Sequence, residues 1–136
     1  MEVENGVLLN VEGSDIIFGK FNFPEGVTSI GDSAFFYCRS LTQIKIPEGV
    51  TSIGIGAFYR CDSLTQIEIP KSVTNIGNNA FYYCNNLNKI KYGENILELP
   101  NNVTNILLNK YGLIVLTEEG VNVLSPILVT PFGIST

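Results

Sequence analysis

Three cysteines are the residues whose chemistry and spacing first suggest a site. Cys38, Cys61 and Cys84 follow one another at intervals of 23 residues. A structural zinc ion takes four Cys or His ligands, whereas the chain has three cysteines and no histidine, so no zinc site is expected. A disulfide between neighbouring positions is conceivable, but an odd number of thiols argues against a disulfide framework. We expect three small buried thiols.

The residue sets of the common catalytic mechanisms are missing as well. Without histidine there is no Ser-His-Asp set and no Cys-His pair, and the glycines belong to turns, not to a phosphate-binding loop. Only a carboxylate-based or metal-dependent activity would remain conceivable. We therefore predict that the protein is not an enzyme and takes no metal and no cofactor.

Composition narrows the class of partner. The chain has 13 acidic and 8 basic residues and a net charge of −5, which opposes the electrostatic attraction that drives most nucleic-acid binding. With 45% hydrophobic and 15% charged residues it should fold, yet it has no run near the ~20 apolar residues of a membrane span. We expect neither a nucleic-acid partner nor a membrane-spanning segment.

A 23-residue repeat positions these residues. It is written three times, at 23–45, 46–68 and 69–91, and the first two copies share 16 of 23 residues. Partial coils flank the copies: Phe18-x-x-Phe21-x-Phe23-Pro24 precedes them, and Pro100-x-x-Val103 follows after seven extra residues around 92–98 that should bulge out of register. We divide the chain into an N-terminal cap (1–17), repeats (18–106) and a C-terminal cap (107–136).

Each repeat is expected to form one coil of a solenoid. Alternation around Ile44 and Ile46 predicts a main strand with these two residues inward, and a second short strand follows at 50–53. Apolar residues at three- to four-residue spacing then suggest a short helical turn, which Asp32 or Asn78 could cap. The core should hold Phe35, Phe58 and Phe81, and a hairpin at 112–124 should cover the last coil.

Two sets of side chains become candidate partner-binding surfaces, because coils that stack bring equivalent positions into columns. The first set is polar, carries a local positive bias, and either binds acidic groups of a partner or merely solvates a sheet. It comprises Lys20, Asn22, Gln43, Lys45, Gln66, Glu68, Lys89 and Lys91. The second set is aromatic and either packs within the protein or forms a binding ridge. It comprises Phe36, Tyr37, Tyr59, Arg60, Tyr82 and Tyr83.

The unit can be compared with known repeats. The pattern Ile-Pro-x-x-Val-Thr-x-Ile-Gly-x-x-Ala-Phe-x-x-Cys-x-x-Leu-x-x-Ile, read from residues 46–67, resembles the BspA-like, or treponemal-type, leucine-rich repeat over residues 18–106. The resemblance implies a leucine-rich-repeat solenoid with a parallel β-sheet on its concave face. It also implies a place on the surface of a microbe and a role in adhesion, including binding of extracellular-matrix proteins and host cells.

Our functional hypothesis is a non-catalytic scaffold that binds a protein partner, in adhesion or host interaction. One alternative is self-assembly into a homo-oligomer through an uncapped end of the solenoid. The other is an intracellular or host-injected adaptor, because residues 1–6 carry acids where a secretory signal has basic residues. The sequence therefore leaves the compartment open between the cell surface, secretion and the cell interior.

Overall fold

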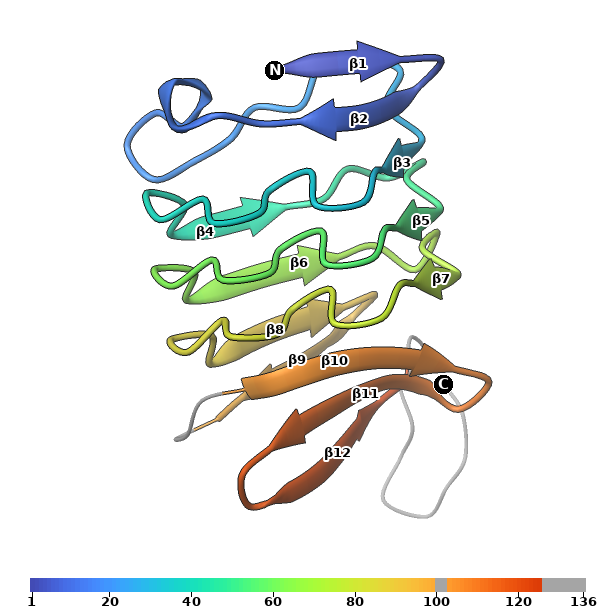
Figure 1. Cartoon of the computed structure of the whole chain (residues 1–136). Helices are drawn as coiled ribbons and strands as arrows, with labels where there is room; N and C mark the ends of the chain where they lie inside the picture. The colour runs from blue at the N-terminus through green and yellow to red at the C-terminus, as the bar shows by residue number, and fades with distance from the viewer. Residues whose placement is uncertain (100–102, 126–136) are drawn as a thin grey trace.

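The computed structural model describes residues 1–99 and 103–125, and in them the chain is a β-solenoid of stacked coils (Figure 1). One sheet has the strand order β4-β6-β8-β9 and a second sheet, made of shorter strands, has the order β1-β2-β3-β5-β7. The strands of the first sheet are β4 (Gln43–Lys45), β6 (Gln66–Ile69), β8 (Lys89–Tyr92) and β9 (Asn95–Glu98). The strands of the second are β1 (Glu2–Glu4), β2 (Val7–Asn10), β3 (Ser29–Ile30), β5 (Ser52–Ile53) and β7 (Asn75–Ile76).

In the parallel strands β3, β5 and β7 of one sheet and β4, β6 and β8 of the other, each residue is paired with the residue 23 positions away, which is the length of one repeat. Ile44, Ile67 and Ile90 are partners in three successive parallel strands, and Ser29, Ser52 and Asn75 are partners in the other sheet. A displacement by one residue would turn the buried isoleucines to the solvent, so the apolar pattern fixes the stacking. The predicted parallel-sheet solenoid is confirmed.

The segment between the two sheets differs from the expected short helix. Residues 55–60 and 62–63 form turns, because alternate backbone N–H groups bond in different directions. The N–H groups of Ala57, Tyr59 and Cys61 bond to carbonyls three residues earlier, whereas those of Gly56, Phe58 and Arg60 bond to carbonyls of the next coil. In an α-helix every N–H bonds to the carbonyl four residues earlier in the same helix. The bonds to the next coil therefore exclude a helix in this segment. Among the described residues the one helical element is a 3-10 turn, η1 (Gly13–Asp15).

The expected capping role of Asp32 also changes. Its carboxylate Oδ1 accepts a hydrogen bond from the N–H of Ile55 in the next coil at 2.8 Å. The side chain therefore ties neighbouring coils together and does not close a helix end.

The core is a column of phenylalanines. The rings of Phe35 and Phe58 stack with centroids 4.7 Å apart, and those of Phe58 and Phe81 with centroids 5.1 Å apart. All three side chains are fully buried. Around them lie the branched aliphatic residues that the repeat pattern placed inward, among them Ile46, which is also buried.

The first coil departs from the repeat. Phe18 occupies the position of Leu41 in the repeat, yet it is 98% exposed, at a tight turn closed by the bridge between Ile17 and Lys20. Its φ is +50° and that of Gly19 is +80°, which is the left-handed backbone of a hairpin turn. Phe21, at the position of Ile44 in the repeat, is buried and lies edge-on to Phe35 with centroids 5.1 Å apart.

Antiparallel strands lie at both ends of the stack (Figure 1). At one end β1 pairs with β2; at the other β10 (Val103–Asn109), β11 (Gly112–Thr117) and β12 (Gly120–Leu124) form a separate sheet. The predicted hairpin around Glu118 and Glu119 is present as β11 and β12. β10 runs across residue 106, where the sequence placed the end of the repeats; Pro100 and residues 126–136 of the expected cap lie outside the described residues.

The sequence predicted that the extra residues around 92–98 bulge out of register, and this prediction is wrong. Tyr92 ends β8, the chain turns at Gly93 and Glu94, and β9 pairs antiparallel with β8. The insertion therefore lengthens the main sheet by one strand. Antiparallel strands can be joined by a two-residue turn. By pairing with β8, β9 provides hydrogen-bond partners for backbone groups at an edge that would otherwise be exposed.

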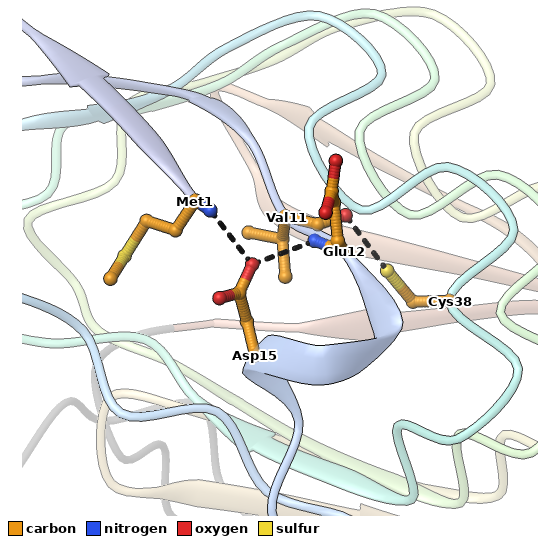
Figure 2. A network of polar contacts seen from close by, with 5 residues as sticks. All are labelled: Met1, Val11, Glu12, Asp15 and Cys38. Carbon is orange, nitrogen blue, oxygen red and sulfur yellow. Dashed lines mark hydrogen bonds and ion pairs between the residues drawn. The ribbon is translucent and has the colours of Figure 1, made fainter.

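A small polar network holds the N-terminal end (Figure 2). The Met1 ammonium lies 2.9 Å from Asp15 Oδ2, which also accepts the N–H of Glu12 at 2.8 Å. The Glu12 N–H lowers the pKa of Asp15 most, followed by the bond from the ammonium, and the Asp15 bond raises the pKa of the Met1 ammonium. The Cys38 thiol of the next coil donates to the Val11 carbonyl at 3.7 Å.

Substituting Phe58 by alanine should cost about 3–5 kcal/mol in the free energy of unfolding, because it removes the middle ring of the buried column. Urea denaturation followed by circular dichroism measures this change. Phe36→Ala is the matched control, since Phe36 is half-exposed, and should cost less than about 1.5 kcal/mol. Equal losses for the two variants would contradict the assigned core.

Protection of the Glu12 amide against hydrogen exchange should depend on pH. The folded pKa of Asp15 is lowered, so its contribution is present above the unfolded value of about 3.9 and is lost as pH falls through the folded pKa. The folded pKa of the Met1 ammonium is raised, so that contribution is present below about 8 and is lost as pH rises through the folded pKa. Asp15→Asn should flatten both limbs, after correction for intrinsic exchange. A wild-type profile in the variant would refute this role.

Candidate functional site

The two predicted columns of polar side chains lie in register on the main sheet. Gln43, Gln66 and Lys89 are partners in one column, and Lys45, Glu68 and Lys91 are partners in the other. We call these six residues the polar face. Lys20 and Asn22, which the sequence added to the columns, lie outside any strand but beside the same sheet, where they line a hollow with β4 and β6.

Half of the polar face is neutralised within the protein. Lys91 lies 3.6 Å from Glu68, and Lys89 lies 3.4 Å from Glu98. Glu98 was missed by the sequence analysis because β9 was expected to be a bulge, and its pairing with Lys89 depends on the β8–β9 hairpin. Both pairs are solvent-exposed, so each adds at most about 1 kcal/mol to stability. Among the described residues of the polar face and its hollow, Lys20 and Lys45 are then the lysines without an acidic partner.

The second candidate surface is an aromatic ridge along the turn segments. It consists of Phe36, Tyr37, Tyr59, Arg60, Tyr82 and Tyr83. The rings of Phe36 and Tyr59, and those of Tyr59 and Tyr82, stack with centroids 5.8 Å apart in both pairs. Tyr59 is partly buried between its neighbours, whereas Phe36 and Tyr82 are exposed. The structure thus forms one continuous file of three stacked rings, one from each coil.

The other file of the ridge consists of Tyr37, Arg60 and Tyr83. All three have a left-handed backbone, with φ of +59°, +60° and +61°. A left-handed conformation costs a residue other than glycine about 1–2 kcal/mol. The first left-handed position of each coil, four residues earlier, holds Ser33, Gly56 or Asn79, which are small. The ridge therefore carries large side chains at positions where the backbone favours glycine.

Arginines join this file to its surroundings. The Arg60 guanidinium lies 5.1 Å from the centre of the Tyr83 ring, and that of Arg39 lies 5.2 Å from the centre of the Tyr37 ring. Arg39 was not singled out from the sequence; its place in the repeat, one residue after the cysteine, is the signal that could have revealed it. Cation–π contacts at exposed sites contribute about 0.5–1 kcal/mol, so the arginines keep the tyrosines in place.

The cysteines lie inside the stack and not at a surface. Cys61 donates its thiol to the Phe35 carbonyl and Cys84 donates to the Phe58 carbonyl, each at 3.1 Å. All three are buried and free. Burial raises the pKa of Cys38 to about 11; the hydrogen bond with Cys84, and then burial, raise the pKa of Cys61. The thiols therefore fill the repeat pocket and bond coil to coil.

Two further features bear on function. Within residues 1–99 and 103–125, no group of three or more His, Cys, Asp or Glu side chains is placed to hold a metal ion. No helix in this part of the chain is sufficiently long and apolar to cross a membrane. The polar face with its hollow and the aromatic ridge are the two candidate surfaces for contact with a ligand.

A stack of 23-residue coils, with a parallel sheet on one side and turns on the other, defines the chain as a leucine-rich-repeat protein. The family model of the BspA type leucine-rich repeat region, in six copies, matches residues 14–109. The chain belongs to this family. Repeats of this type are generally non-catalytic scaffolds that bind proteins.

Two solved structures contain chains similar to this one. A leucine-rich cell-surface protein from Faecalibacterium prausnitzii A2-165 is 27% identical, with 79% of this chain and 34% of that chain covered and a TM-score of 0.34. A leucine-rich-repeat protein from Eubacterium ventriosum ATCC 27560 is 23% identical, with 83% and 44% covered and a TM-score of 0.30. The aligned region is less than half the length of either structure. Comparison with curated proteins finds no match.

The three thiols should resist modification in the folded protein. Each thiol is buried, so a reagent cannot reach the sulfur atoms. The pKa values of Cys38 and Cys61 are also raised, so these two form little thiolate at pH 8. Mixing with an aromatic disulfide reagent should release almost no chromophore from native protein and three equivalents in denaturant. Rapid native-state labelling of even one cysteine would show that the repeat pocket is open.

Proposed function

We propose that this chain is a protein-binding scaffold whose ligand contacts the aromatic ridge, and that it serves adhesion or host interaction of a microbe. Family membership supports the binding role in general, and the resemblance of the repeat supports adhesion. The observation that carries the proposal is the left-handed file of Tyr37, Arg60 and Tyr83. Strained backbone that persists in a fold is concentrated at functional sites.

The argument compares two positions that have the same backbone requirement. At the first left-handed position the chain uses Ser33, Gly56 and Asn79, which minimise the cost. At the second position it has two tyrosines and an arginine, so the free-energy cost of a left-handed backbone is present in all three coils. Packing alone does not account for the choice, because Tyr37 and Tyr83 are each 42% exposed. A requirement for these side chains at the surface does account for it.

The side chains also have the properties of a protein-binding surface. Tyrosine and arginine are enriched at the energetic centres of interfaces, and stacked rings lose little conformational freedom on binding because they are already ordered. The proximity of Tyr83 is the largest cause that raises the pKa of Tyr82, so that hydroxyl stays neutral and can donate a hydrogen bond at physiological pH. The ridge thus offers a rigid, largely apolar surface with hydroxyl and guanidinium donors.

Replacing Tyr37, Arg60 and Tyr83 together by asparagine should abolish ligand capture without unfolding the protein. Asparagine tolerates the left-handed backbone, so the free energy of unfolding should change by less than about 1 kcal/mol per site. Capture is measured on surfaces coated with basement-membrane extract and on cultured epithelial cells. Tyr111→Asn is the matched control, because Tyr111 is an exposed tyrosine at the turn after β10.

Full capture by the triple variant would remove the ridge as the binding surface. Failure of the wild-type protein to bind any of these surfaces would remove the adhesion role. Self-assembly is separated by light scattering across concentrations: a molar mass that stays at the monomer value excludes a homo-oligomer as the purpose of the solenoid.

A further inference from the structure

The main sheet has an unfinished edge at β4. The register of the repeat places residues 20–23 beside β4, as β4 lies beside β6. The carbonyl of Gly19 does accept the N–H groups of Thr42 and Gln43, at 2.9 and 3.3 Å. Beyond this point the first coil leaves the sheet, and residues 21–24 form no strand. In Figure 1 the chain between η1 and β3 is drawn without an arrow.

The lost pairing is visible in the backbone hydrogen bonds. Between the next two coils the Ile46 N–H bonds to the Glu68 carbonyl at 3.0 Å. The equivalent bond, from the Phe23 N–H to the Lys45 carbonyl, is not made within the described residues. The N–H and C=O of a residue in a parallel strand point to the same side. On this side, β4 therefore leaves the Gln43 carbonyl and both backbone groups of Lys45 without a backbone partner in the part of the chain that the structure describes.

The first coil carries larger side chains at this point than the later coils do. Phe21 lies edge-on against Phe23 and Phe35, with centroids 4.9 and 5.1 Å apart. The later coils have Ile44 and Ile67 at the position of Phe21. The phenylalanine packing is thus found where the first coil leaves the sheet.

A hollow of about 510 Å³ lies at this edge. The partly buried Phe23 and Pro47 provide apolar surface, and Asn22, Gln43 and Gln66 provide amide donors and acceptors. Sites of this size, with apolar walls and a few polar groups, are typical of ligand-binding clefts. The three residues of β4 offer an edge of roughly 10 Å, which suits a short extended segment.

The charge of the hollow is opposite to that of the whole protein. Lys20 and Lys45 line it and have no acidic partner within 4.0 Å among the described residues. Its one acidic residue, Glu68, already pairs with Lys91 at 3.6 Å. The chain as a whole carries a net charge of −5. A ligand with carboxylates would therefore be attracted here and repelled by most of the remaining surface.

We infer that this hollow binds an extended acidic segment of a partner protein, which adds to the sheet at the edge of β4. Its backbone meets the unpaired groups of Gln43 and Lys45, and its carboxylates meet the ammonium groups of Lys20 and Lys45. Strand addition of this kind takes affinity from main-chain bonds and specificity from alternate side chains. The site lies apart from the aromatic ridge and does not depend on the function proposed for it.

Binding can be measured with a short fluorescein-labelled peptide of alternating Glu and Thr, by fluorescence anisotropy on the full chain. The same peptide with Gln in place of Glu should bind at least about tenfold more weakly. Methylation of the backbone nitrogens that would face β4 should weaken binding similarly, because it removes donors while keeping the charge. Equal binding of the neutral peptide, or of the methylated one, would overturn the inference.

The matched variants are Lys20→Gln with Lys45→Gln, against Lys71→Gln with Lys110→Gln, which make the same charge change away from the hollow. The first pair should weaken peptide binding at least about tenfold and leave the melting temperature unchanged, whereas the second should bind as wild type does. Equal weakening by both pairs would indicate general charge attraction and would overturn the inference. Competition by free glutamate as effective as that by the peptide would reduce the hollow to a simple anion site.

The ridge variant with three asparagines separates this inference from the proposed function. It should bind the acidic peptide like wild type while losing capture of matrix and cells. Loss of peptide binding in that variant, with the fold intact, would place the acidic segment on the ridge and overturn its assignment to β4.

Discussion

The hydrogen bond from one coil to the next is the interaction on which the whole structure depends. Along the main sheet it joins equivalent positions of neighbouring coils, as from the Thr65 N–H to the Thr42 carbonyl. In the turn segment it takes every second N–H, as from Phe58 to the Ala80 carbonyl. No coil can satisfy its own backbone, so a single repeat cannot fold. The same bonds bring like side chains into files, which makes both a core and a surface out of one repeated pattern.

This constraint explains why the turns are strained and why the strain is useful. Bonds that alternate between the coil and its neighbour require left-handed residues at fixed places, of which Ser33 and Tyr37 are the first pair. One place is filled by residues that suit the backbone. The other is filled by Tyr37, Arg60 and Tyr83 at a cost, and their side chains face the solvent beside a file of stacked rings. The resulting ridge is rigid because the backbone beneath it has no freedom.

The ends of the stack show what happens where the repeat stops. At the C-terminal end β9 continues the sheet, and its Glu98 pairs with Lys89. At the N-terminal end the first coil leaves the sheet after Gly19, which leaves backbone groups of β4 and two lysines open to a ligand. One end of the polar face is thus completed and neutralised, and the other is open and positive. Because the end at β4 has, among the described residues, both free backbone groups and unpaired lysines, we expect a ligand of the polar face to bind there.

By itself the sequence determined the solenoid, its register and its core, because a 23-residue period that places Phe35, Phe58 and Phe81 in line permits one stacking. It could not show that the segment around Gly56 makes turns, since helical spacing of apolar residues is also satisfied by turns bonded to the next coil. It could not show that Phe18 is exposed, that residues 95–98 form a strand, or that β4 has an open edge. These were decided by the tertiary structure, because each depends on which backbone groups a neighbouring segment satisfies.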